Sequence, residues 1–257
     1  MCDKVSVIII TKNNEHEIGT CLESVKWADE MVVLDSYSDD RTEQICKGYG
    51  AQFYQGPFEG YSTQLNRCLD LASNEWILNV YADEVITAEL RDEIQAVLRG
   101  EVRRVCDGYT CHRHQYLHAH LIKHSGWYPH PELRFFRKAR ARFRSREPHQ
   151  KVDVRGRVGR LKGGLLHRSW VNNGEIFDNF MEYAKTEARW AYEHEGRRIT
   201  WINFLELPYE FWRRFILRGG MFHGTFGIIM SLRMSAYRYV KYTLMWELQN
   251  QDKLDRG

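Results

Sequence analysis

The first hundred residues alternate between short apolar runs and longer segments in which apolar residues recur every three or four positions. The run at 5–10 is almost continuously apolar, as expected of a central parallel strand that is buried on both faces. The expected strands are 5–10, 31–35, 52–54 and 76–81, and the expected helices are 15–27, 42–49, 62–71 and 88–98. Strands that alternate with amphipathic helices of these lengths predict a mostly parallel α/β sheet.

Three polar residues stand at the ends of these expected strands. Thr11 follows the first strand, Asp35 ends the second, and Asp83 follows the fourth. Because ligands of parallel sheets bind beyond the carboxyl ends of the strands, we expect the three side chains around one crevice. An aspartate at a strand end is also common in turns and helix caps, and the pattern alone leaves that alternative open.

From residue 107 onward the pattern changes. Strand-like runs at 108–112 and 133–137 are separated by glycine, proline and histidine, which predicts a mixed sheet that closes the crevice. Six histidines lie in this region near Cys106 and Cys111: His112, His114, His118, His120, His124 and His130. Cysteine and histidine suit zinc. The alternative is histidines on the surface or in contact with a substrate, because no Cys-x-x-Cys pair accompanies them.

The C-terminal region is aromatic and basic. Residues 201–246 contain twelve aromatic residues, six lysines or arginines and two acids, and Gly219-Gly220 interrupts them. We expect two or three amphipathic helices here. Such helices suit an anionic membrane surface. Packing on the rest of the chain, or on a second copy in a homo-oligomer, is the other interpretation, and the two are compatible.

Charge is unevenly distributed along the chain. The net charge is only +3, but residues 134–162 contain twelve lysines or arginines and two acids. A basic block of this kind favours phosphate-bearing partners such as a nucleotide, a lipid head group or a nucleic acid, and otherwise is a solvated face. No nucleic-acid-binding motif accompanies it, so we do not expect a nucleic acid partner.

Cysteine usage and hydropathy predict the compartment. The six cysteines have no framework spacing, and several occupy apolar helix positions, which favours a reducing compartment. The first residues lack a signal-peptide pattern, and no apolar run approaches the roughly 18 residues that span a bilayer. We therefore expect a cytoplasmic protein.

Several motifs resemble inverting GT-A glycosyltransferases of glycosyltransferase family 2. The opening motifs are VSVIIITKN (5–13), CLESV (21–25) and VLDSYSDDRT (33–42). The later motifs ADE (82–84), GWYP (126–129), LRFFR (133–137) and HQKV (149–152) narrow the resemblance. With them, the chain is similar to the bacterial branch that includes lipopolysaccharide inner-core β-1,4-glucosyltransferases.

The resemblance implies a fold, a division into domains and a reaction. It implies a GT-A domain over 1–199, with a nucleotide-sugar-binding half (1–105) and an acceptor-side half (106–199), followed by a helical tail over 200–257. The implied reaction moves a hexose from a nucleotide sugar, such as a UDP-hexose, to a lipid-linked saccharide of the lipopolysaccharide core type. The implied stereochemistry is inversion, and the implied location is peripheral on the inner face of the bacterial inner membrane.

The resemblance also implies roles for individual residues. Asp83 corresponds to the family's metal-ligating acid, and Mg²⁺ or Mn²⁺ held there neutralises the diphosphate leaving group. His167 and Arg168 either contact the diphosphate or form a pair at the edge of the core. The implied nucleotide-sugar-binding residues are Thr11, Asp35, Gln64, Asn66 and Asp83.

The general base that inversion requires is less clear from the resemblance. The family has acids at the positions of Gln150 and His130, and glutamine cannot ionise. The candidate bases are therefore Glu132, Glu147, Glu84 and neutral His130. The chain also departs from the family at Tyr81, where an acid is usual, and at Leu65, where lysine is usual. The alternative function is thus a weakened or silent GT-A module that binds a sugar nucleotide or a partner enzyme.

Overall fold

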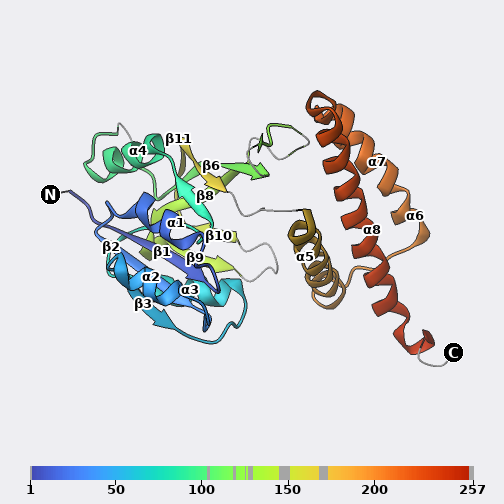
Figure 1. The fold of residues 1–257 in the computed structure, drawn as a ribbon, viewed down its shortest axis with the longest axis horizontal. Coiled ribbons are helices and arrows are strands. Elements are labelled where there is room, and N and C mark those ends of the chain that lie inside the picture. The colour runs from blue at the N-terminus through green and yellow to red at the C-terminus, as the bar shows by residue number, and fades with distance from the viewer. Residues whose placement is uncertain are drawn as a thin grey trace. The chain divides into compact units, whose positions relative to one another are not determined.

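The computed structural model describes residues 2–102, 105–117, 120–124, 126, 130–144, 151–167 and 173–254 (Figure 1). The chain forms two compact units. The sheet unit consists of residues 1–116 and 129–169, and the helical unit of residues 117–128 and 170–257. This division falls ahead of the predicted boundary after residue 199, because helix α5 (Asn173–Glu193) packs against α8 (Thr225–Leu254).

The sheet unit is built on a mixed sheet with the strand order β3-β2-β1-β4-β8-β6-β11-β5. Strands β1 to β4 are parallel to one another, β8 is antiparallel to both β4 and β6, and β11 is parallel to β6 and antiparallel to β5. The strands are β1 (Val5–Thr11), β2 (Glu30–Asp35), β3 (Gln52–Gln55), β4 (Trp76–Asn79), β5 (Glu84–Ile86), β6 (Gly108–Leu117), β8 (Pro131–Arg137) and β11 (Val158–His167). Strands β9 (Ala141–Arg144) and β10 (Lys151–Val154) form a separate antiparallel pair, and β7 (His120–Leu121) is a short strand.

Helices cover both faces of this sheet. The helices of the sheet unit are α1 (Ile18–Val25), α2 (Thr42–Gly48), α3 (Tyr61–Leu71) and α4 (Ala88–Leu98), with a 3₁₀ turn η1 (Lys138–Arg140). Residues of α1, α2 and α4 share one apolar cluster with Ile9, whereas residues of α3 and β9 share the other with Ile8. The consecutive apolar residues of β1 therefore serve opposite faces, as predicted for a central strand. This is the α/β GT-A type of fold, Rossmann-like in its parallel half, that was expected from the sequence.

The six cysteines are all free thiols in the sheet unit. Cys2 is exposed, and the other five are buried. Burial raises the pKa of Cys46, Cys68 and Cys111 to about 12. The buried thiols thus behave as small apolar side chains, in agreement with their positions in the sequence pattern.

The helical unit has a long hairpin at its centre. Helices α6 (Trp201–Phe204) and α7 (Glu206–Trp212) and the π-helical turn η2 (Arg213–Leu217) lead to a turn at Gly219, after which the 3₁₀ turn η3 (Gly220–His223) precedes α8. Gly219 has φ 69°, a left-handed conformation that glycine adopts with little strain, so the predicted break is confirmed. Figure 1 shows α7 running alongside α8, and the two helices are in contact. Among the described residues, no helix is long and apolar enough to cross a membrane.

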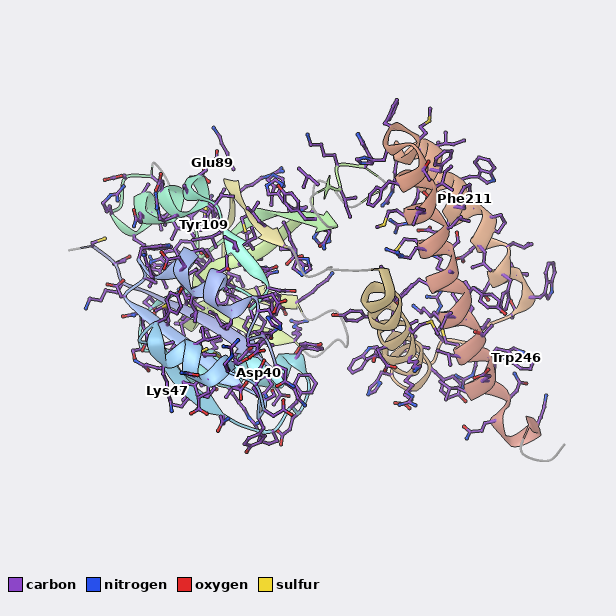
Figure 2. All side chains as sticks on the ribbon, viewed as in Figure 1. Asp40, Lys47, Glu89, Tyr109, Phe211 and Trp246 are labelled. Atoms are coloured by element: carbon purple, nitrogen blue, oxygen red, sulfur yellow. The ribbon has the colours of Figure 1, made fainter. Side chains whose placement is uncertain are left out.

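Figure 2 shows the side chains of both units. On the sheet unit, Lys47 and Glu89 are exposed and Tyr109 is buried. On the helical unit, Trp246 of α8 is exposed, although it is a large apolar residue. Trp246 is one of several large apolar residues that the helical unit exposes.

Candidate functional site

The carboxyl ends of the parallel strands bring the predicted polar residues to one edge of the sheet. Thr11 and Asp35 are register partners at the ends of β1 and β2, and the Ser36 amide donates to the Thr11 carbonyl at 2.9 Å. β4 pairs with β1 on its other side, and Asp83 lies in the turn that follows β4. Thr11 and Asp35 are therefore neighbours at this edge, and Asp83 follows the strand beside them; the crevice that all three would line stays a prediction.

Asp35 is fully buried and shapes the loop that follows β2. Its carboxylate accepts hydrogen bonds from the Ser38 amide at 2.8 Å, from the Ser38 hydroxyl and from Gln55 Nε2 at 3.2 Å. Thr11 Oγ1 donates to Asn14 Oδ1 at 2.9 Å. Both side chains fix loops at the sheet edge, and their contact with a nucleotide stays a prediction.

Helix α3 holds the other predicted nucleotide-sugar residues. Gln64 is buried and donates from Nε2 to the Pro57 carbonyl at 2.9 Å, while its Oε1 has no hydrogen-bond partner among the described residues. Asn66 exchanges two hydrogen bonds with the main chain of Phe143, at 2.9 and 3.0 Å. Asn66 therefore ties α3 to β9. Leu65 lies in the apolar cluster under the sheet, so the absence of a lysine there does not alter the strand-end edge.

Asp83 is paired with a histidine from the end of β11. β11 runs antiparallel to β5, which places His167 opposite Glu84 and beside Asp83. Asp83 Oδ2 lies 2.9 Å from His167 Nε2, and His167 Nδ1 lies 2.8 Å from Gln115 Oε1 on β6. Burial alone would raise the pKa of Asp83, but the hydrogen bond and charge of His167, with the charge of Arg113, lower it to about 2. Asp83 is thus a carboxylate at neutral pH.

This pair fits a divalent cation that is shared with a substrate. His167 Nε2 and Asp83 Oδ2 lie 2.9 Å apart, so a cation bound by both would displace the proton of their hydrogen bond, and the Gln115 contact at Nδ1 is the usual outer-sphere support of a metal-binding histidine. The described residues contain no group of three or more histidines, cysteines, aspartates or glutamates placed to hold a metal. Mg²⁺ and Mn²⁺ do not need such a cage, because phosphate oxygens and water complete their coordination. The histidines that were considered for zinc form no such group where they are described, and His118 lies outside the described residues.

Glu84, a candidate base from the sequence, is closed off from any substrate. It is fully buried, and it is bound by Arg134 Nη2 at 2.9 Å, Arg113 Nε at 2.9 Å and the Tyr81 amide at 3.0 Å. The Arg134 guanidinium also lies 4.6 Å from the centre of the Tyr81 ring. The acid that is usual at position 81 is therefore replaced by an aromatic face that covers a buried arginine.

Glu132 and His130, two further candidates, form a pair. Glu132 Oε1 lies 3.1 Å from His130 Nδ1, and Arg134 Nε donates to Glu132 Oε2 at 2.8 Å. Burial alone would raise the pKa of Glu132. The opposing effect of Arg134, His130 and Arg113 is larger and holds this pKa well below its usual range. Such a carboxylate accepts protons poorly, whereas an exposed imidazole that it orients is a suitable acceptor. The third candidate base, Glu147, lies outside the described residues, as do Gln150 and the candidate diphosphate contact Arg168.

Arg113, Gln115 and Arg134 are the residues that the sequence analysis did not assign to the site. Arg113 and Gln115 are two residues apart on β6, where alternate side chains share one face of a strand. That spacing is visible in the sequence. What β6 lies beside is not, since its neighbour β11 comes from a distant part of the chain.

We compared the chain with known protein families, with individual relatives and with solved structures. The family model described as glycosyl transferase family 2 matches residues 6–155, more than half of the chain. An uncharacterized glycosyltransferase of Rickettsia conorii is 26% identical, over 98% of this chain and 93% of the relative. The lipopolysaccharide core biosynthesis glycosyltransferase LpsC of Rhizobium meliloti is 27% identical, over 92% of this chain and 89% of the relative. Among solved structures, S. aureus TarS 1–349 superimposes with a TM-score of 0.49 at 15% identity, covering 96% of this chain and 92% of that one.

Proposed function

Since the chain belongs to glycosyl transferase family 2, we propose that it transfers a hexose from a UDP-hexose to a lipid-linked saccharide, with inversion, at the cytoplasmic face of the bacterial inner membrane. The family supports sugar transfer from a nucleotide sugar. The relative LpsC, named for lipopolysaccharide core biosynthesis, supports an acceptor of that class. The chain and this relative match over most of both lengths, so the likeness includes the helical unit.

The observation that supports the donor site best is the Asp83–His167–Gln115 chain. Gln115 orients the His167 ring, and His167 together with Arg113 keeps Asp83 ionised. These two side chains would hold Mg²⁺ or Mn²⁺, which when bound neutralises the diphosphate leaving group. The loops fixed by Asp35 and Thr11 and the helix that carries Gln64 and Asn66 lie at or near the same strand ends, where a nucleotide would bind.

His130 is the base that the geometry favours for the acceptor hydroxyl. Its imidazole is 57% exposed, and Glu132 holds it through Nδ1 at 3.1 Å, which leaves Nε2 to accept a proton. Glu132 itself is held by Arg134 and serves to orient the ring. Glu147 remains the alternative acid from the sequence.

Donor binding tests this proposal directly. We expect calorimetry with a UDP-hexose to show affinity that depends on Mn²⁺, and Asp83→Asn to weaken it by about 100-fold, because one of two protein ligands is lost. Asp92→Asn, which changes an exposed acid on α4, is the matched control and should bind normally. Mn²⁺-dependent affinity that survives Asp83→Asn contradicts the assignment.

A module that binds the donor but transfers slowly is the second candidate. It is favoured by Tyr81, whose ring faces Arg134 where the family has an acid, and by the low pKa of Glu132. Under this alternative the wild-type protein binds donor with little turnover, and Gln150→Glu raises turnover at least ~10-fold by restoring a base. Rapid turnover of the wild type, falling in His130→Gln, supports transfer through His130 instead.

A further inference from the structure

The first helical arm of the hairpin, residues 201–217, exposes apolar side chains to solvent, although Phe204 and Leu207 of the same arm pack on the apolar cluster of the helical unit. Its exposed residues are spaced by four, four, three and four positions, which places them on one side of a helix. They are Trp201, Leu205, Tyr209, Trp212 and Ile216, with exposed fractions of 72, 59, 59, 54 and 49%. We call this set the outer stripe.

Glu210 of the same arm lies on its inner side, among arginines. Glu210 is 1% exposed and pairs with Arg213 Nη2 at 2.6 Å, Arg214 Nε at 2.5 Å and Arg238 Nη2 of α8 at 3.4 Å. Lys241 of α8 is likewise paired with Glu187 of α5 at 2.7 Å. A surface helix of a soluble protein usually has polar residues on the side that faces water, whereas this arm has a second apolar stripe there.

The turn between the two arms continues the apolar surface. We call residues 217–229 the tip; its exposed apolar residues are Leu217, Met221, Phe222, Ile228 and Ile229. Residues 211–246 contain no aspartate or glutamate. Two exposed cations accompany the tip. Arg218 is part of it, and Lys123 precedes His124, whose ring lies 5.8 Å from the Phe222 ring.

From this exposed apolar surface we infer that the outer stripe and the tip bind a phospholipid surface by inserting apolar side chains. Phospholipid matches both parts of the surface, because acyl chains accept the apolar residues and anionic head groups accept Arg218 and Lys123. The tryptophans and the tyrosine of the stripe are the residue types enriched at the membrane interface. A second copy of the chain fits less well, since a two-fold contact would set the same acid-free, cationic rim against itself.

The inference gives the proposed function its membrane contact, and it changes the expected character of that contact. The sequence suggests electrostatic attraction by a basic tail. In the structure four of these basic residues form internal ion pairs: Arg213, Arg214, Arg238 and Lys241. They therefore contribute little to electrostatic attraction to anionic lipids. Binding is therefore expected to survive salt that screens exposed charges.

Vesicle co-sedimentation of the full chain tests this inference. The vesicles are phosphatidylethanolamine with about a quarter phosphatidylglycerol, in parallel with neutral phosphatidylcholine vesicles. We expect binding to both, reduced by less than about 3-fold between about 0.1 and 0.5 M NaCl. The double variant Leu217→Glu/Phe222→Glu should bind at least ~10-fold less, because both side chains are 75% exposed and would enter the acyl region. Val158→Glu, at an exposed valine of the sheet unit, is the matched control.

The readouts separate this inference from the proposed function. Mn²⁺-dependent donor binding of the double variant, measured without vesicles, should be unchanged, which also shows that the sheet unit is folded. Circular dichroism checks the helices, and Leu217→Ser/Phe222→Ser replaces the double variant if they are lost. Wild-type binding abolished by salt, or equal binding of wild type and double variant, overturns the inference. A change from oligomer to monomer with vesicle binding intact assigns the surface to a second copy.

Discussion

Each of the two units buries one glutamate among arginines, and the two networks are assembled in different ways. Glu84 of the sheet unit joins Arg113 on β6 and Arg134 on β8, two strands that follow it at a distance in the chain. Glu210 of the helical unit takes Arg213 and Arg214 from the next turn of its own segment. The first network locks the strands behind the candidate donor site. The second keeps charge inside a unit whose outer surface is apolar.

The accessibility of the arginines makes the networks unequal. Arg134 is only 4% exposed and Arg113 is 25% exposed, whereas the Arg214, Arg213 and Arg238 side chains are 12%, 22% and 32% exposed. When the carboxylate is lost, a partly exposed arginine can turn to water, but the buried Arg134 cannot and keeps only Glu132 as its counter-charge. The same type of contact should therefore have a different energetic weight in each unit.

The largest effect is expected from neutralising Glu84. Glu84→Gln should lower the free energy of unfolding of the sheet unit by about 3–5 kcal/mol, because Arg113 and Arg134 lose a buried counter-charge. Glu210→Gln should lower that of the helical unit by about 1–3 kcal/mol. Urea unfolding at pH 7, followed by hydrogen exchange of peptides from each unit, measures both. An equal or larger loss for Glu210→Gln would remove the distinction.

A smaller effect is expected at Gln115, which supports His167 without touching substrate. Gln115→Leu should weaken Mn²⁺ binding in the presence of UDP by about 10–100-fold, because the imidazole loses the partner that fixes its orientation. Gln95→Leu on α4 provides a control for the same change of side chain. If Gln115→Leu leaves Mn²⁺ affinity unaltered while unfolding becomes easier, the residue has only a structural role.

The pH dependence of stability should separate the units at opposite extremes. In the sheet unit the pKa of Asp83 is lowered from 3.8 to about 2, and that of Glu132 is lowered from 4.5. Both contribute stability above their unfolded values, and this stability is lost as pH falls below about 4.5 toward 2. In the helical unit burial and Glu187 raise the pKa of Tyr237, and burial and Glu206 raise that of Tyr242.

Those tyrosines contribute stability below pH 10, their ordinary value, which is lost as pH rises above it. Peptide-resolved hydrogen exchange should thus show the sheet unit opening first in acid and the helical unit opening first in alkali. Tyr237→Phe should reduce the alkaline loss in the helical unit and leave the acid transition as it was. Simultaneous opening of both units at each extreme would show that the shifts do not control their stability.

The sequence predicted the elements that depend on local pattern. Alternating apolar runs located β1 and β2, helical spacing located α4 with its observed bounds, and Gly219 marked the break in the helical unit. β4 ends at Asn79, two residues earlier than expected, because the chain turns there toward Asp83. The long helix α5 was placed in the acceptor half, since its packing partner α8 is remote in sequence.

The candidate site was predictable only where a residue stands at a strand end. Asp83, Thr11 and Asp35 could be placed by counting strands, because parallel neighbours end at the same edge. The partner of Asp83 could not, since the pairing of β11 with β5 and β6 decides that His167 and Gln115 meet it. Leu65 shows the converse error. As a departure from a polar family position it suggested an altered site. Its position on the inner side of α3 instead places it in the apolar core.

The distribution of thiols makes the chain its own reporter of unfolding. Cys2 is exposed, whereas Cys21, Cys46, Cys68, Cys106 and Cys111 are sealed within the sheet unit, and residues 112–257 contain no cysteine. A thiol-reactive mass label should therefore add once to the native protein and up to five more times as the sheet unit opens, because buried thiols with raised pKa values react slowly. Melting of the helical unit alone leaves the mass unchanged. The number of labels per molecule thus distinguishes opening of the sheet unit from opening of the helical unit, with no engineered probe.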